Sequence, residues 1–142
     1  MHEEKIALVR QQIAAVRAAA EKREIRDIYV AACGGSLATL CPIQYVLERE
    51  TDAVSVSAVN AAEFYRDPPR RVGEHALVIL NSQSGTTAET VAAARLARER
   101  GALTAAFTTV PGSAIEAAVD CPIYYYDDQE APYPLLLSIF PE

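Results

Sequence analysis

Short apolar runs alternate with amphipathic stretches along most of this chain. Runs rich in Val, Ile, Leu and Ala predict β-strands at 27–33, 53–59, 77–80, 103–108 and 122–126. Apolar residues at helical spacing predict helices at 37–48 and 86–100, with shorter ones at 61–65 and 114–119. Strands that alternate with helices form right-handed β-α-β units. The pattern therefore predicts an α/β fold: a five-stranded parallel sheet of flavodoxin-like order 2-1-3-4-5, sandwiched between two layers of helices.

The two ends of the sequence lie outside this alternation. A stripe of apolar residues predicts a helix at 3–24, which either covers the domain or contacts a partner subunit. Near the other end, Pro132 and Pro134 interrupt the pattern and allow one short helix at most. We therefore expect an N-terminal helix within 1–26 and a single domain over 27–142 whose last helix is cut short. The apolar stripe of the N-terminal helix comprises Ile6, Val9, Ile13, Val16 and Ala20.

Composition limits the classes of function. With 142 residues, 51% of them hydrophobic and 23% charged, the chain has the profile of a soluble globular domain. Its net charge of -6 argues against a nucleic-acid surface, which needs clustered Lys and Arg. No run is long enough to span a membrane and no basic leader precedes the first helix, so a cytoplasmic protein is expected. Neither a metal nor a cofactor is expected, because the three cysteines and two histidines have no metal-ligand spacing.

A hydroxyl-rich turn follows the third predicted strand and leads directly into a helix. The first backbone N–H groups of a helix lack intrahelical partners and carry partial positive charge, so they favour an anion. One N-cap needs only one hydroxyl, and this turn has four, together with Gly85 for a tight backbone turn. The excess favours a phosphate-binding loop over an ordinary cap. The predicted loop is Ser82, Gln83, Ser84, Gly85, Thr86 and Thr87.

A second loop, Gly34-Gly35-Ser36, follows the first predicted strand. Gly35 allows close approach of the backbone to a ligand, and Ser36 can either cap the next helix or donate to an anion. This loop lacks the G-x-G-x-x-G pattern of dinucleotide-binding folds. In the order 2-1-3-4-5, the two loops become neighbours at the carboxyl edge of the sheet, where such folds bind ligands.

The segments A-C-G-G-S (32–36) and S-Q-S-G-T-T-A-E-T (82–90) together resemble the SIS, or sugar isomerase, domain, a phosphosugar-binding module. Residues 101–113 are similar to the following segment of glucosamine-6-phosphate synthase isomerase domains and, more closely, of fructosamine-phosphate (fructoselysine-6-phosphate) deglycases. The resemblance implies that Gly35 and Ser36 contact the sugar or its phosphate. It also implies that the phosphate oxygens are held by Ser82, Gln83, Ser84 and Thr87. Thr86 stands where many relatives have Glu.

A sugar-phosphate isomerase or deglycase needs an acid/base group near C1 and C2 of its substrate. In two-domain relatives these groups come largely from a second SIS half or a neighbouring subunit. The resemblance therefore implies an amino-terminal half, completed by a homo-oligomer or a second SIS chain. Within this sequence the candidate catalytic carboxylates are Glu63 and Glu130. A surface residue at a helix end is the alternative for Glu63, and a tail residue is the alternative for Glu130.

Two classes of function follow. The first is part of an enzyme that acts on a 6-phosphosugar or a fructosamine phosphate. The second is a non-catalytic SIS sensor that binds a sugar phosphate, of the kind fused to DNA-binding regulators, although this sequence has no basic DNA-binding segment. An assembly module that binds no sugar is a third possibility.

Overall fold

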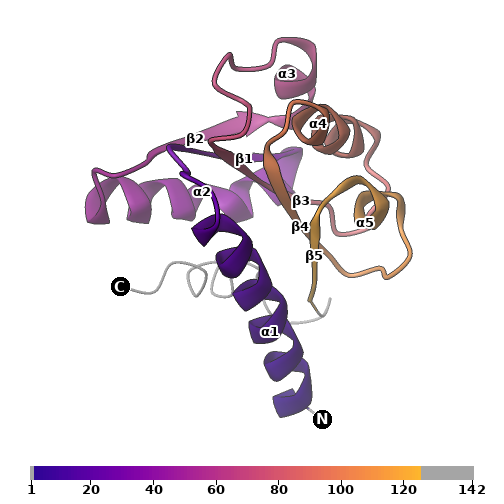
Figure 1. Ribbon diagram of the computed structural model, residues 1–142. Helices are drawn as coiled ribbons and strands as arrows, with labels where there is room; N and C mark the ends of the chain where they lie inside the picture. Colours follow the sequence, from indigo (N-terminus) through magenta and orange to yellow (C-terminus); the bar gives the residue numbers. More distant parts are fainter. Residues whose placement is uncertain (1, 126–142) are drawn as a thin grey trace.

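The computed structural model describes residues 2–125, in which five strands alternate with helices (Figure 1). The first half of the chain contains α1 (His2–Glu21), β1 (Asp27–Ala32), α2 (Gly34–Glu50), β2 (Ser55–Asn60) and α3 (Ala61–Arg66). The second half contains β3 (Ala76–Asn81), α4 (Ala88–Glu99), β4 (Leu103–Thr108), α5 (Ala114–Ala118) and β5 (Cys121–Tyr124). The predicted alternation is confirmed.

All strand pairs in the sheet are parallel, and the strand order is β2-β1-β3-β4-β5. This is the predicted order, and β2 lies at an edge. Ala32 at the end of β1 pairs with Asn60 on one side and with Asn81 on the other. The carboxyl ends of β2, β1 and β3 therefore lie level with one another, and the loops that follow them share one edge of the sheet.

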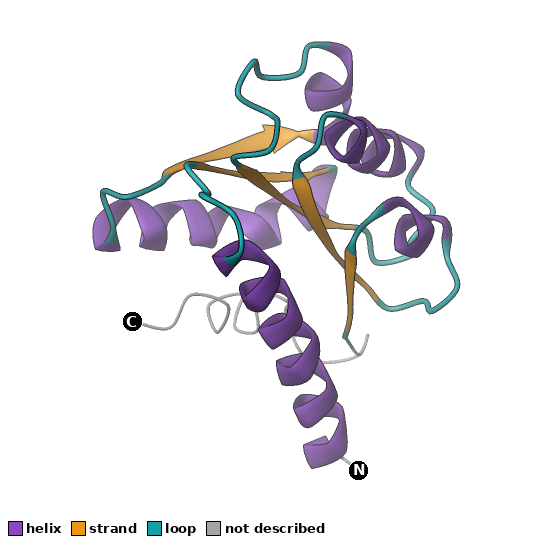
Figure 2. Cartoon of the chain, viewed as in Figure 1, coloured by secondary structure: helices purple, strands orange, loops and turns teal. Residues whose placement is uncertain are grey.

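Helices cover both faces of the sheet (Figure 2). One core joins the sheet to α1 and α2, and the other joins it to α3, α4 and α5. β1, β3 and β4 are buried along their whole length, as their nearly continuous apolar sequences predict. Val9, Ile13 and Val16 of α1 are buried in the first core. The first helix is therefore a cover helix of this domain, one of the two roles expected for it.

The predicted starts of α2 and α4 are wrong. α2 begins at Gly34, three residues before the predicted start, because Gly34 adopts a φ of +55° and turns the chain directly from strand to helix. α4 begins at Ala88 rather than Thr86, because Thr86 still belongs to the turn and Thr87 is the N-cap. The last strand ends at Tyr124, and the tail around Pro132 and Pro134, which was expected to allow one short helix at most, lies outside the described residues.

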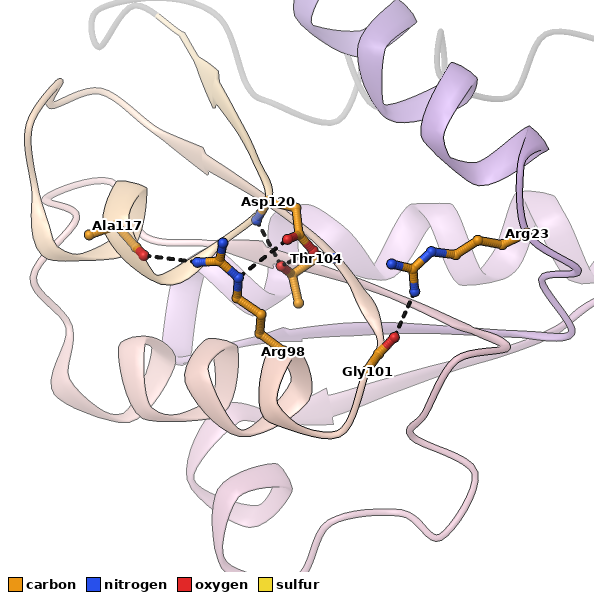
Figure 3. A network of polar contacts seen from close by, with 6 residues as sticks. All are labelled: Arg23, Arg98, Gly101, Thr104, Ala117 and Asp120. Carbon is orange, nitrogen blue, oxygen red and sulfur yellow. Dashed lines mark hydrogen bonds and ion pairs between the residues drawn. The ribbon is translucent and has the colours of Figure 1, made fainter.

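Polar side chains close the amino edge of the sheet (Figure 3). The Asp120 carboxylate accepts hydrogen bonds of 3.0 Å from both the N–H and the hydroxyl of Thr104, and Arg98 pairs with it at 3.3 Å. Arg23 donates to the Gly101 carbonyl at 2.6 Å, which ties the end of α1 to the start of β4. At β1, the buried Asp27 carboxylate pairs with Arg71 at 2.9 Å. The charged groups of this edge are therefore bound to the protein itself.

Candidate functional site

The fold brings the two predicted loops to the same edge of the sheet. The loop 82–87 connects β3 to α4, and Gly35 and Ser36 lie at the start of α2, directly after β1. Because β1 and β3 are neighbouring parallel strands, both helices begin at the carboxyl edge. The side chain of Asn81 reaches the backbone carbonyl of Ser36 at 3.5 Å, so the end of β3 lies against the first turn of α2. The two loops are in contact through that residue.

The loop 82–87 is a tight turn held by its own backbone. Ser82 is buried, and its N–H donates to the Phe107 carbonyl of β4 at 3.0 Å. The N–H of Gly85 then donates back to the Ser82 carbonyl at 3.0 Å. The Gln83 carbonyl accepts from both the N–H and the hydroxyl of Thr109, at 3.1 Å and 2.7 Å. These bonds fix the loop against the end of β4 before any ligand is present.

Gly85 occupies a position that only glycine fills without strain. Its φ is +71°, and a Cβ atom there would lie 2.1 Å from Ser113 Oγ and 3.0 Å from Thr108 Oγ1. The Gly85 carbonyl also accepts from the Ile115 N–H at 3.0 Å. Because Gly85 has no side chain, its backbone can therefore lie close to the segment before α5 and also form the tight turn.

The loop hydroxyls are paired in a way that leaves protons for a ligand. Ser82 Oγ lies 3.0 Å from Thr87 Oγ1, and Ser84 Oγ lies 3.0 Å from Thr86 Oγ1. Each hydroxyl pair uses one of its two protons in the bond between them, so the second remains to donate elsewhere. Ser84 and Thr86 are exposed, and Thr87 is half-buried at the N-terminus of α4. The loop can therefore present hydroxyl donors beside the free N–H groups of a helix start.

Ser36 lies inside the first turn of α2, half-buried, so it does not cap that helix. The N-cap is Cys33, which makes no side-chain capping bond. The N–H of Ser36 donates to the Cys33 carbonyl at 3.2 Å, and no hydrogen bond within residues 2–125 uses the Ser36 hydroxyl. Of the two roles expected for this side chain, capping is wrong and donation to an anion stays a prediction.

Asn81 connects the end of β3 to the start of α2, and the sequence analysis did not anticipate it. It ends β3, its side chain is buried, and it donates to Thr39 Oγ1 at 2.9 Å and accepts from the Tyr125 hydroxyl at 3.2 Å. Thr39 in turn donates to the Ser36 carbonyl at 2.7 Å. The available signal was a polar amide directly after a run of four apolar residues, at the end of a strand that is buried on both faces.

The candidate catalytic carboxylates are not joined to this cluster. Glu63 lies in the first turn of α3, exposed, and within residues 2–125 no hydrogen bond or ion pair involves its carboxylate. Glu130 lies outside the described residues. Their catalytic roles therefore stay predictions.

Another carboxylate, that of Glu116 in α5, is bound by the Gly112 N–H and the Tyr124 hydroxyl. The hydrogen bond from Tyr124 lowers the pKa of Glu116 most, and the hydrogen bond from Gly112 lowers it further. Burial, together with the hydrogen bond to Glu116 and its negative charge, raises the pKa of Tyr124 to about 12. The sequence analysis did not anticipate this pair, which fixes the end of β5 to the loop after β4.

A cavity of about 520 Å³ lies elsewhere, between α1 and α2 toward the amino ends of β1 and β3. Its walls are mainly apolar, including Val16, Ile28 and Leu77. Thr51 is the one hydroxyl residue among the described residues that line it. Arg17 and Arg23 also line the cavity, but Arg17 is paired with Glu21 and Arg23 donates to the Gly101 carbonyl, and Glu21 and Glu50 add negative charge. The lining therefore does not favour an anionic ligand, and the candidate site stays at the loops of the carboxyl edge.

No helix within residues 2–125 combines the length and the apolar character needed to cross a membrane.

Comparison with solved structures finds a candidate phosphosugar isomerase from Bacillus subtilis, which superposes with a TM-score of 0.88 at 35% identity. That match covers 96% of this chain and 43% of the other.

Two curated relatives are similar to this chain in amino-acid sequence. Fructosamine deglycase FrlB from Bacillus subtilis is 41% identical over 75% of this chain and 33% of its own length. Glutamine–fructose-6-phosphate aminotransferase (isomerizing) from Symbiobacterium thermophilum is 39% identical over 79% of this chain and 18% of its own length. The chain thus spans a third or less of these relatives. The SIS domain family matches residues 23–140, which include both loops, all five strands and α2 to α5. This chain belongs to the SIS domain family.

Proposed function

We propose that the carboxyl edge of this domain binds a sugar phosphate. The observation that carries the proposal is the hydroxyl cluster of loop 82–87 at the start of α4, facing the Ser36 turn at the start of α2. Two helix N-termini and several hydroxyl donors converge there without a Lys or Arg in either loop. That combination suits a small phosphate group held by neutral donors.

The sugar part of the proposal rests on the relatives. A fructosamine deglycase and an isomerizing fructose-6-phosphate aminotransferase share about two fifths of their residues with this chain in the aligned region. We propose that Ser82, Gln83, Ser84 and Thr87 hold the phosphate, with Gly85 and Thr86 completing the turn. Gly35 and Ser36 then contact the sugar or the phosphate from the other side.

We further propose that residues 27–142 act as one SIS half of a sugar-phosphate isomerase or fructosamine-6-phosphate deglycase in the cytoplasm. Moving a proton between C1 and C2 needs a base close to those carbons. Glu63 and Glu130 are the candidates within this sequence. Because the Glu63 carboxylate is exposed and contacts neither loop within the described residues, we propose that a second SIS half, or another copy of this chain in a homo-oligomer, completes the acid/base set.

The test is calorimetric titration of the chain with fructose 6-phosphate, glucose 6-phosphate, glucosamine 6-phosphate, fructoselysine 6-phosphate and inorganic phosphate. The proposal predicts that at least one sugar phosphate binds more tightly than inorganic phosphate. Binding to none of the four sugar phosphates would contradict it.

Single-hydroxyl variants locate the binding. Ser84→Ala and Thr87→Val are each expected to weaken sugar-phosphate binding about tenfold, because each removes a donor to a charged group. Ser55→Ala is the matched control, since it deletes an exposed hydroxyl at the amino edge of β2. Equal affinities for wild type and both loop variants would exclude the loop as the phosphate site.

A further inference from the structure

The proposed site has two halves, the Ser36 turn at the start of α2 and the loop 82–87. The polypeptide between Cys33 and Ser82 is the shortest covalent connection between them. The start of α2 follows β1 through Gly34, at φ +55°, and Gly35, neither of which has a side chain to hold the turn in place. Its N-cap, Cys33, supplies no capping hydrogen bond. Strand pairing fixes Ala32 beside Asn81, but it does not fix how the first turn of α2 faces the loop after β3.

Asn81 supplies a polar connection between these halves. It is the residue directly before Ser82, so its backbone belongs to the phosphate loop's own strand. Its side-chain N–H group donates to Thr39 Oγ1 at 2.9 Å and approaches the Ser36 carbonyl at 3.5 Å, both in the first turns of α2. The Thr39 hydroxyl in turn donates to the Ser36 carbonyl at 2.7 Å.

The other end of the amide is also held. The Tyr125 hydroxyl donates to Asn81 Oδ1 at 3.2 Å, and the ring of Tyr125 packs against Phe107 with centroids 6.5 Å apart. Asn81 is 2% exposed, and its amide makes its hydrogen bonds within the protein rather than to water. A side chain fixed at both ends in this way holds its partners at a set separation.

We propose that Asn81 is a positioning residue that sets the separation of the Ser36 turn and the loop 82–87, with the Ser36 turn contacting the sugar. This inference rests on the proposed sugar-phosphate function and adds a consequence to it. A sugar phosphate that contacts both halves needs Asn81, whereas inorganic phosphate, which has no sugar for the Ser36 turn to contact, does not. The signature is therefore a change in selectivity between two ligands, which a loss of fold stability does not produce.

The experiment compares the dissociation constants of fructose 6-phosphate and inorganic phosphate for four proteins. Asn81→Leu removes the hydrogen bonds of the side-chain amide to Thr39, Ser36 and Tyr125 and keeps a side chain of similar shape. Thr39→Val removes the intermediate hydroxyl without changing the size of the side chain, and Thr39→Ser, the matched control, restores that hydroxyl. Thermal unfolding of each variant confirms that it is folded at the titration temperature.

Asn81→Leu and Thr39→Val are expected to weaken fructose 6-phosphate binding about tenfold relative to inorganic phosphate, while Thr39→Ser keeps the wild-type ratio. An unchanged ratio in both variants, with wild type binding fructose 6-phosphate, would overturn the positioning role and leave the proposed function intact. If Asn81→Leu does not fold, Thr39→Val decides the question alone. If wild type binds fructose 6-phosphate no better than phosphate, the Ser36 turn adds nothing to the binding of this sugar, and the positioning role fails.

Discussion

The two edges of the sheet use polar residues in opposite ways. At the amino edge, Asp120 and Asp27 are each paired with an arginine, and Asp120 also accepts two bonds from Thr104 (Figure 3). At the carboxyl edge, the loop 82–87 contains hydroxyls that bond to one another and retain protons, and no charged side chain. The difference teaches that polar content alone does not identify a candidate site. Polar groups indicate one when they still have protons to donate to a ligand.

The carboxyl edge is not open throughout. Glu116 and Tyr124 form a bound pair beside the loop after β4, and Gln83 and Gly85 are tied to the same region through their backbone carbonyls. Among the described residues, the hydroxyl groups at this edge with protons still to donate therefore include those of the Ser36 turn and residues 82–87, and the buried Ser113 hydroxyl beside Gly85 has no hydrogen-bond partner. A rigid backbone that carries unsatisfied donors suits ligand binding, because little reorganisation is needed when the anion arrives.

The largest expected effect comes from breaking the rigid turn at the carboxyl edge. Gly85→Ala combines a left-handed backbone with a Cβ that overlaps Ser113, so it should lower the free energy of unfolding by about 3 kcal/mol. Gly112→Ala is the control, because its φ is +77° but no atom lies within 4 Å of the added Cβ. Backbone strain alone predicts a loss of about 1 to 2 kcal/mol there. Urea unfolding of both variants measures the difference, and equal losses would contradict the steric account.

A smaller effect is expected from opening the amino edge. Asp120→Ala removes the acceptor for the N–H and hydroxyl of the buried Thr104, and should lower the free energy of unfolding by about 2 kcal/mol. Sugar-phosphate affinity should not change, because this network lies at the opposite edge from the loops. Glu99→Ala, at an exposed position of α4, is the control for stability. The contrast between the edges fails if Asp120→Ala weakens ligand binding while stability is retained.

The smallest expected effect is a change in pH dependence. The pKa of Tyr124 is raised to about 12 from its usual value of 10, so folding favours its protonated form. Its contribution to stability is complete below pH 10 and is lost as the pH rises from 10 to 12. Tyr124→Phe should therefore make stability fall less steeply across this interval.

Denaturant unfolding at several pH values tests this change in slope. Tyr29 and Cys121, whose pKa values are also raised by burial, supply the slope that remains. Tyr65→Phe, which alters an exposed side chain of α3, should leave the slope unchanged. Wild type and Tyr124→Phe with the same slope would show that the phenol does not titrate as the Glu116 pair predicts.

The sheet and the position of the turn at 82–87 could be predicted because they depend on local patterns. The apolar run at 77–80 followed by hydroxyls and a helical repeat defines strand, turn and helix without reference to the rest of the chain. The strand order 2-1-3-4-5, expected from the flavodoxin-like arrangement of such folds, was confirmed. The start of α2 was predicted too late, because a positive φ at Gly34 lets the helix begin at once, and glycine permits that conformation without requiring it.

The contacts of Asn81 could not be predicted, because they depend on tertiary structure. They require β1 and β3 to end at the same level, α2 to place Thr39 above β3, and Tyr125 to point back across the sheet. The partnership of Glu116 with Tyr124 depends in the same way on how α5 packs beside β5. Sequence periodicity identifies which elements form, whereas the pairing of polar groups between elements needs their final register.

The measurement that tests the central claim most directly is an amide nuclear magnetic resonance titration with fructose 6-phosphate. The account predicts that the largest shift changes lie at 34–39 and 82–90, the two segments that begin α2 and α4. Amides around Asp27, Thr104 and Asp120 should change little, because their partners are already in place. Shift changes concentrated at that amino edge, or absent from residues 82–90, would contradict the assignment of the site to the carboxyl edge.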